Sequence, residues 1–186
     1  MLRGCVTFCL FAGCFSLATA QEVVHALTGT VTSVNPTART IQINTDDGSE
    51  GLFKDLTKSY TSFDFDKNIR ADAIAADAFT EKGTHVIVYY FGDGDLRTAV
   101  ALQDLGTRPL DRSSGTVVKF DRHGHLLTIK NSSGIDKSFL IVAKTRAETS
   151  VGAVEGYKFD PRKGDQVRVT ATPATGNETV LFIRAS

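Results

Sequence analysis

One pattern of residues occurs twice in this chain of 186 amino acids, and it constrains the fold more than any other feature. Residues 29–48 and 115–134 align without a gap, and each stretch begins with Gly-Thr-Val and ends with Gly. A second shared pattern, Lys-Gly followed by two alternating valines, occupies residues 82–88 and 163–169. Alternating apolar residues between turn glycines are typical of short β-strands. The chain is therefore interpreted as a tandem duplication of one small β-rich unit.

Each copy is predicted to contain five short strands, with a helical segment before the fourth. The predicted strands are 28–34, 40–44, 51–56, 85–91 and 96–105 in the first copy and 115–120, 125–130, 137–142, 166–172 and 178–184 in the second. The apolar spacing of residues 71–79, which contain no Gly or Pro, predicts a helix in the first copy. Residues 147–157 take its place in the second copy, where Gly152 and Gly156 disfavour a regular helix.

This order of elements, in units of this size, is that of a small OB-like barrel. We therefore expect a mostly β protein of two tandem OB-like β-barrels, the first with one helix between its third and fourth strands. The first barrel is expected over residues 21–106 and the second over residues 114–186. The polar stretch 107–113, which contains Pro109, is predicted to be the linker between them.

Residues 1–20 are interpreted as a secretory signal peptide. Arg3 supplies the positive start, an apolar run follows, and Ala-Thr-Ala precedes cleavage before Gln21. The apolar run is shorter than the roughly 20 residues that a membrane span needs, so no transmembrane segment is expected. A lipoprotein anchored through Cys14 is the alternative, because residues 11–14 resemble a lipobox. We expect a periplasmic or secreted protein of a bacterium.

Charge and cysteine content limit the classes of function. All three cysteines lie within the predicted signal peptide, so the mature chain would have no disulfide and no thiolate nucleophile. Residues 21–108 contain 13 acidic and 8 basic residues, whereas residues 109–186 contain 8 acidic and 12 basic ones. This asymmetry predicts contact between an acidic first unit and a basic second unit. The neutral total argues against a nucleic-acid-binding protein.

A family resemblance rests on three motifs of the second copy: Gly-Thr-Val at 115–117, Lys-Gly-Asp at 163–165 and Val-Arg-Val at 167–169. With them the chain resembles the small repeats of unknown function that are found in secreted bacterial proteins. The resemblance implies an exported β-barrel repeat, and it brings no catalytic residue with it. The first copy departs from the pattern by its helix and by its aromatic fourth strand.

Motifs that carry chemistry are scarce. His123 and His125, with Asp121 nearby, have the residue types of a zinc or copper site, but they fall where a hairpin turn is expected. The sequence contains no Gly-x-Ser-x-Gly, no His-Glu-x-x-His and no glycine-rich phosphate loop. We therefore expect no catalytic residue, no resident metal and no cofactor, and we predict that the protein is not an enzyme.

One difference between the copies indicates a contact surface. If the aligned valines of the fourth strand face the core, Ile87, Tyr89 and Phe91 face the other way. Their counterparts in the second copy are Arg168, Thr170 and Thr172, which form an ordinary polar surface. An apolar stripe of this kind is expected to be covered by the predicted helix, by the second unit, or by a ligand or partner.

These observations predict an exported, non-enzymatic binding or structural module of the cell envelope. The candidate binding residues are Ile87, Tyr89 and Phe91. Two alternatives stay open: a metal-binding protein that uses the turn with His123 and His125, and an anion or oligosaccharide binder that uses the basic second unit.

Overall fold

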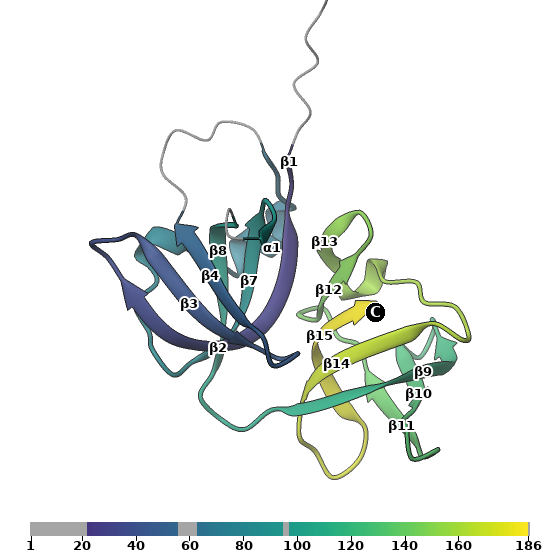
Figure 1. Ribbon diagram of the computed structural model, residues 1–186. Helices are drawn as coiled ribbons and strands as arrows, with labels where there is room; N and C mark the ends of the chain where they lie inside the picture. The colour runs from purple at the N-terminus through teal and green to yellow at the C-terminus, as the bar shows by residue number, and fades with distance from the viewer. Residues whose placement is uncertain (1–21, 56–62, 95–96, 186) are drawn as a thin grey trace, which may run out of the picture.

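A computed structural model describes residues 22–55, 63–94 and 97–185 of the protein (Figure 1). The predicted signal peptide at 1–20, its cleavage before Gln21 and the alternative lipid anchor on Cys14 lie outside the described residues. In the part of the chain that is described, no helix has the length and apolar character needed to cross a membrane.

The first barrel is a six-stranded sheet with the strand order β4-β3-β2-β7-β8-β6. A parallel pairing between β4 and β8 closes the sheet into a barrel, and β6 adds to the outer side of β8. Its strands are β2 (His25–Asn35), β3 (Thr40–Thr45), β4 (Glu50–Asp55), β6 (Ile74–Ala75), β7 (His85–Phe91) and β8 (Thr98–Gly106). A separate parallel pair joins β1 (Glu22–Val23) to β5 (Phe63–Asp64).

The second barrel repeats this strand order. Its sheet runs β11-β10-β9-β14-β15-β12-β13, and a parallel pairing between β11 and β15 closes it. Its strands are β9 (Asp111–Asp121), β10 (Leu126–Lys130), β11 (Asp136–Leu140), β12 (Arg146–Thr149), β13 (Gly152–Glu155), β14 (Gln166–Thr172) and β15 (Glu178–Ala185). The expected mostly β fold of two small OB-like barrels is thus confirmed. Duplication as the origin of the two barrels stays an interpretation of the sequence.

The first-barrel helix was predicted in the right interval between strands but at the wrong residues. It is α1 (Lys67–Ala71), a single short turn of helix, rather than residues 71–79. Asp66 caps it, because its side chain accepts hydrogen bonds from the backbone N–H groups of Asn68 and Ile69. Such a cap satisfies amide groups that have no partner within the helix, and it sets where the helix begins.

Residues 74–79, which were predicted to be helical, form part of the barrel instead. Residues 74–75 pair with β8 as β6, and a 3-10 turn at Ala76–Ala78 follows. This turn places Phe79 in the barrel core, so tertiary packing overrides the helix propensity of the alanines. The second barrel has no α-helix at 147–157 either: β12 and β13 occupy most of these residues, and a 3-10 turn at Gly156–Lys158 precedes a phenylalanine that is also buried.

Each barrel has its own apolar core, and a third apolar cluster lies outside both. Val86 and Val88 of β7 face the first core, and Val167 and Val169 of β14 face the second, as the alignment of the copies predicts. The third cluster contains residues of both barrels, namely Val24, Ala26, Ile69, Ile87, Tyr89, Phe91, Val100, Ala101 and Phe182. Apolar burial therefore stabilises the contact between the barrels as well as each barrel.

Candidate functional site

The outer face of β7 is the apolar stripe that the sequence singled out, and it is covered. Ile87 and Tyr89 are fully buried and Phe91 is 6% exposed. Ile69 of α1 and Phe182 of β15 belong to the same cluster, so the helix and the second barrel both contribute to the cover. In the structure these three side chains are therefore closed off from solvent. Their predicted role as binding residues stays a prediction.

Ion pairs join the barrels around this apolar contact. Three of them pair a carboxylate of the first barrel with a cation of the second: Asp46 with Arg112 at 2.6 Å, Asp72 with Arg146 at 2.6 Å, and Asp66 with Lys158 at 2.9 Å. A fourth runs in the other direction, between His25 and Glu148 at 2.7 Å. Contact between an acidic first and a basic second unit, which the charge counts predict, is therefore present in the structure.

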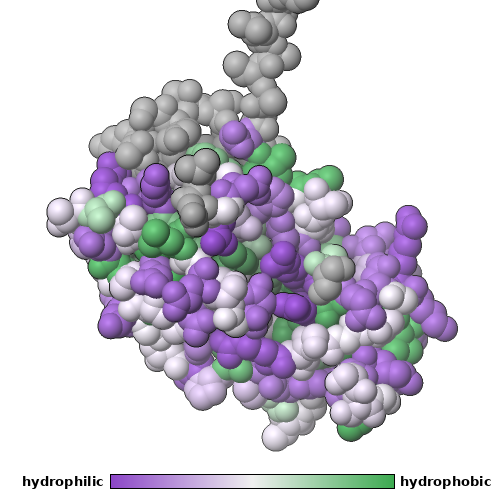
Figure 2. All heavy atoms as spheres, viewed as in Figure 1, coloured by the Kyte–Doolittle hydropathy of each residue, from purple (hydrophilic) through white to green (hydrophobic). Residues whose placement is uncertain are grey.

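A cleft of about 500 Å³ lies beside these contacts, between the two barrels. The first barrel supplies part of β2, Tyr90 of β7 and the turn between β3 and β4, which points toward β14 (Figure 1). The second barrel supplies parts of β9, β14 and β15. The lining residues are Leu27, Thr28, Thr45, Asp46, Asp47, Ser49, Tyr90, Arg97, Arg112, Ser113, Ser114, Arg168, Val169, Thr170, Phe182 and Arg184. Where the two lobes meet, Figure 2 shows strongly hydrophilic residues with a few apolar ones beside them.

Asp46 crosses from the first barrel to the second at the edge of the cleft. Its Oδ1 accepts a hydrogen bond from Arg112 Nε at 2.6 Å, and its Oδ2 accepts one from the Thr170 hydroxyl at 2.8 Å. A guanidinium and a hydroxyl of the second barrel thus hold a carboxylate between them. Guanidinium and hydroxyl groups are donors that proteins use to bind carboxylate and phosphate groups.

The turn that carries Asp46 is built by its neighbour. Asp47 accepts hydrogen bonds from the Thr45 hydroxyl and from Ser49, and these bonds lower its pKa to about 2. Gly48 follows with φ of +86°, a conformation that side chains with a Cβ rarely adopt. Residues 45–49 therefore form a tight turn, and Asp47 is ionised at neutral pH.

Four arginines make the cleft cationic. Arg112 is paired with Asp46, and Arg97 donates its Nε to the carbonyl oxygen of Gly94 and lies 4.7 Å from the centre of the Phe53 ring. Neither Arg168 nor Arg184 forms an ion pair with any residue in the described ranges. Against two aspartates, the four guanidinium groups give the lining a net charge of +2. Clefts with one sign of charge concentrate ligands of the opposite sign.

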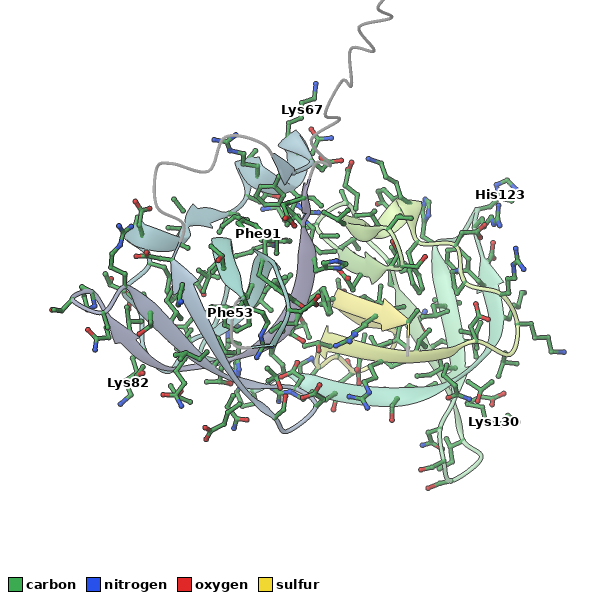
Figure 3. The ribbon with its side chains drawn as sticks, turned by 45° about the horizontal axis from the view of Figure 1, so that its top comes forward. Phe53, Lys67, Lys82, Phe91, His123 and Lys130 are labelled. Carbon is green, nitrogen blue, oxygen red and sulfur yellow. The ribbon has the colours of Figure 1, made fainter. Side chains whose placement is uncertain are left out.

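Tyr90 is an aromatic residue in the lining of the cleft. It packs against Phe53 with ring centres 5.3 Å apart. Figure 3 shows Phe53 inside the first barrel. Burial raises the pKa of Tyr90 above its ordinary value, so its hydroxyl keeps its proton at neutral pH. The cleft therefore combines cations with one partly buried aromatic side chain.

The two histidines proposed as metal ligands lie elsewhere. They are on the hairpin between β9 and β10, on the side of the second barrel that faces away from the first, where Figure 3 labels His123. Asp121 accepts hydrogen bonds from the backbone N–H groups of His123 and the following glycine, which makes it a turn residue. His125 has φ of +51°, its aligned counterpart Arg39 has +55°, and its ring lies 4.6 Å from that of Tyr157.

Arg39 and His125, the two residues with left-handed backbone conformations, occupy the same position of equivalent hairpins. The conformation of the turn is therefore explained without a metal ion. Among the residues that the structure describes, no three or more His, Cys, Asp or Glu side chains are grouped so that they could hold a metal ion. Metal binding by His123 and His125 stays a prediction, which a titration with Zn²⁺ or Cu²⁺ tests.

Sequence reasoning missed the cleft because its lining comes from segments far apart in the chain. Two features of the sequence pointed to residues of the cleft, but they did so separately. Arg168 and Thr170 stood out as the polar counterparts of an apolar stripe, and the basic second unit was considered for anion binding. Only the orientation of the barrels brings these residues opposite the turn with Asp46.

No protein-family model matches the sequence, and a search of curated proteins gave no match. Among solved structures, the chain is similar to a crystal structure of Ag(I)CusF, with 15% identity, a TM-score of 0.33, and coverage of 42% of this chain and 100% of that one. It is also similar to CusF-Ag(I) residues 10–88 from Escherichia coli, with 15% identity, a TM-score of 0.33, and coverage of 42% and 92%. At this TM-score the likeness carries no argument about what the present chain binds.

Proposed function

We propose that this protein is an exported, non-enzymatic binding module that holds an anionic ligand in the cleft between its barrels. The observation that carries the proposal is the pair Arg168 and Arg184. Both are exposed cations that line the cleft, and neither has an ion-pair partner among the described residues. A guanidinium group is a planar fork of donors that fits the two oxygens of a carboxylate or the oxygens of a phosphate.

The rest of the lining supports a polar, anionic ligand. Ser113 and Ser114 lie beside Arg112 in the chain, and their hydroxyls can donate to the same anion. Leu27 and Phe182 are only 7% and 3% exposed, so Tyr90, which is partly exposed, supplies most of the apolar contact. Asp46, bound by Arg112 and Thr170, is a carboxylate of the chain itself that these donors already hold.

The chemistry of the cleft favours binding over catalysis. Its lining, within the described residues, contains no histidine, cysteine, lysine or glutamate. The hydrogen bonds to Asp47 lower its pKa to about 2, which makes it a weak base at neutral pH. General acid–base catalysis works best with a group whose pKa lies near the working pH. The absence of an enzyme activity therefore remains part of the proposal.

The location in the cell envelope is proposed from the signal peptide. The three cysteines are confined to residues 1–20, so the barrels contain none. Packing and the ion pairs between the barrels would then hold the exported protein together without disulfides. Finding the purified periplasmic protein with Gln21 as its first residue would support the assignment, and a lipid on Cys14 would replace it with a membrane anchor.

Isothermal titration calorimetry with glucuronate, citrate and inorganic phosphate tests the ligand class, with glucose as the uncharged probe. We expect at least one anion to bind and glucose not to. Arg168→Gln and Arg184→Gln are each expected to weaken anion binding about tenfold, as the loss of a charged hydrogen bond does. Added salt should weaken binding to the wild-type protein, because the cleft is open to solvent.

Arg122→Gln is the matched control, because Arg122 lies on the β9–β10 hairpin, where it pairs with Asp160. This variant should bind as the wild type does. The proposal is wrong if none of the anions binds, or if the Arg168 and Arg184 variants bind them as tightly as the wild type and the Arg122 control.

A further inference from the structure

The cleft has a neighbouring hollow on the second barrel. This second hollow, of about 440 Å³, lies beside the start of β14. Ser114 of β9 and Arg168 of β14 line both spaces. The two hollows therefore adjoin each other, and Arg168 lies at their junction.

The second hollow has a different chemistry from the cleft. Hydroxyl and amide side chains dominate its lining, among them Thr116, Asn131 and Gln166, and the Gln166 amide donates to the Thr116 hydroxyl at 2.7 Å. Lys130 and Arg168 supply positive charge, and no acidic or aromatic residue of the described chain lines the hollow. Hydroxyls and amides both donate and accept hydrogen bonds, which is what sugar hydroxyl groups require.

Lys130 is free enough to meet a ligand. Its Nζ lies 3.3 Å from an oxygen of Asp136, and both side chains are about half exposed, at 52% and 50%. An exposed pair of this kind contributes little stability and exchanges readily for another anion. Positive side chains therefore follow one another along the path: Arg184 in the cleft, Arg168 at the junction and Lys130 at the far end.

We propose that the ligand is an acidic oligosaccharide that runs from the cleft into the second hollow. This inference rests on the proposed function and names its ligand class. The spaced cations would meet the carboxylates of successive sugar units, and the amides and hydroxyls between them would meet the sugar hydroxyls. A single small anion would leave the second hollow empty.

Two features distinguish this path from other binding modes. Single-stranded nucleic acid is bound by aromatic side chains on which successive bases stack. The aromatic residues along the described path, Tyr90 and Phe182, line only the cleft. OB-folds commonly bind oligosaccharides on the face of their second and third strands, whereas this path follows the first and fourth strands of the barrel, β9 and β14.

The test is a comparison of ligand length. Calorimetry with galacturonate and with oligogalacturonates of increasing length should show affinity that rises about tenfold or more once the chain spans both hollows. The double variant Lys130→Gln with Gln166→Ala should lose this gain and still bind the monosaccharide as the wild type does. Lys119→Gln, an exposed lysine of β9 outside both hollows, is the control of equal charge change.

The outcomes separate the two proposals. If galacturonate binds through Arg184 but longer chains bind no tighter, the oligosaccharide path is wrong and the anion site stands. If neither form binds, this inference fails, and the proposed function fails with it only if glucuronate, citrate and phosphate also do not bind. Tighter binding of an oligothymidylate of matched charge would also overturn the oligosaccharide in favour of nucleic acid.

Discussion

Glu148 of the second barrel contacts the first barrel at two groups, a backbone N–H and a histidine side chain. Its Oε2 accepts the backbone N–H of Ala26 at 2.7 Å, and its Oε1 lies 2.7 Å from Nδ1 of His25. The side chain is only 12% exposed. Burial raises the pKa of Glu148 above the ordinary 4.5, although the hydrogen bonds from His25 and Ala26 oppose this shift. Desolvation of the carboxylate therefore changes its pKa more than the two hydrogen bonds do.

This raised pKa predicts how the stability depends on pH. A carboxyl group that holds its proton more tightly when folded contributes stability below pH 4.5, and that contribution is lost as the pH rises through its folded pKa. Glu148→Gln removes the titration and keeps an oxygen for the Ala26 N–H. In urea unfolding on both sides of pH 4.5, the wild type should therefore lose stability relative to this variant as the pH rises.

Glu155 provides a control of opposite sign. Hydrogen bonds from Lys158 and Asn68 lower the pKa of Glu155 below its ordinary value, so the stability that it contributes is present at higher pH and lost as the pH falls through the folded pKa. Relative to Glu155→Gln, the wild type should gain stability as the pH rises. The same direction of change in both variants would contradict the burial argument for Glu148.

At the scale of elements, β7 and β14 are the equivalent fourth strands of the two barrels, and their outer faces serve different purposes. The aligned valines of both strands face a barrel core. The outward residues of β7 form the buried contact between the barrels, whereas Arg168 and Thr170 of β14 line the cleft. Because the core side is kept alike, the outer side is free to differ without changing the barrel.

The double variant Tyr89→Ala with Phe91→Ala tests whether the outer face of β7 is an internal contact between the barrels. Both side chains are buried, and the Tyr89 hydroxyl also donates to Gln103 Oε1 at 2.9 Å. Truncation of a buried aromatic residue costs about 3–5 kcal/mol, and a chain of this size loses roughly 2–4 °C in Tm per kcal/mol. Calorimetry should therefore show a clearly lower Tm.

Thr172→Ala is the matched control, because Thr172 is exposed and aligns with Phe91. It should change the stability by no more than about 0.5 kcal/mol. An unchanged Tm for the Tyr89 and Phe91 variant, together with loss of ligand binding, would show that the stripe is a binding site rather than an internal contact.

The strands could be predicted from the sequence because each carries its own pattern. Val167 and Val169 alternate with polar residues, and the turns contain Gly, Asp or Asn, so strand and turn are both local signals. The helix at 71–79 was misplaced because its alanines suit a helix, while the burial of Phe79 and the pairing of residues 74–75 with β8 depend on distant strands. The cap at Asp66 was the local signal that could have placed it.

At the scale of the whole molecule, the charge counts predicted that the halves attract but not where they meet. Arg112 lies in the predicted linker at 107–113, yet β9 begins at Asp111 and brings it to the cleft. Asp46 lies in an Asp-Asp-Gly segment, whose residue types indicate a turn and nothing more. The sequence does not indicate the ion pair between Arg112 and Asp46, because that pair depends on how the two barrels are oriented.

Asp46 is therefore the residue at which the contact between the barrels and the proposed binding site compete. It occupies Arg112 and Thr170, two donors that an anionic ligand could use. Asp46→Asn should raise the affinity for small anions several-fold, because it releases Arg112 and increases the net charge of the lining from +2 to +3. The same change should cost roughly 1–3 kcal/mol of stability, because the Asp46 side chain is only 17% exposed and its charge is hydrogen-bonded to Arg112 and to the buried Thr170.

Asp47→Asn separates the two causes of this gain. It adds the same charge to the cleft, but Asp47 bonds within its own turn and holds no arginine of the second barrel through a hydrogen bond. If release of Arg112 matters, Asp46→Asn should bind anions more tightly than Asp47→Asn when both are titrated with the same anion. Weaker binding by Asp46→Asn than by the wild type would show the opposite: that the ligand needs Asp46 to hold the barrels in place around the cleft.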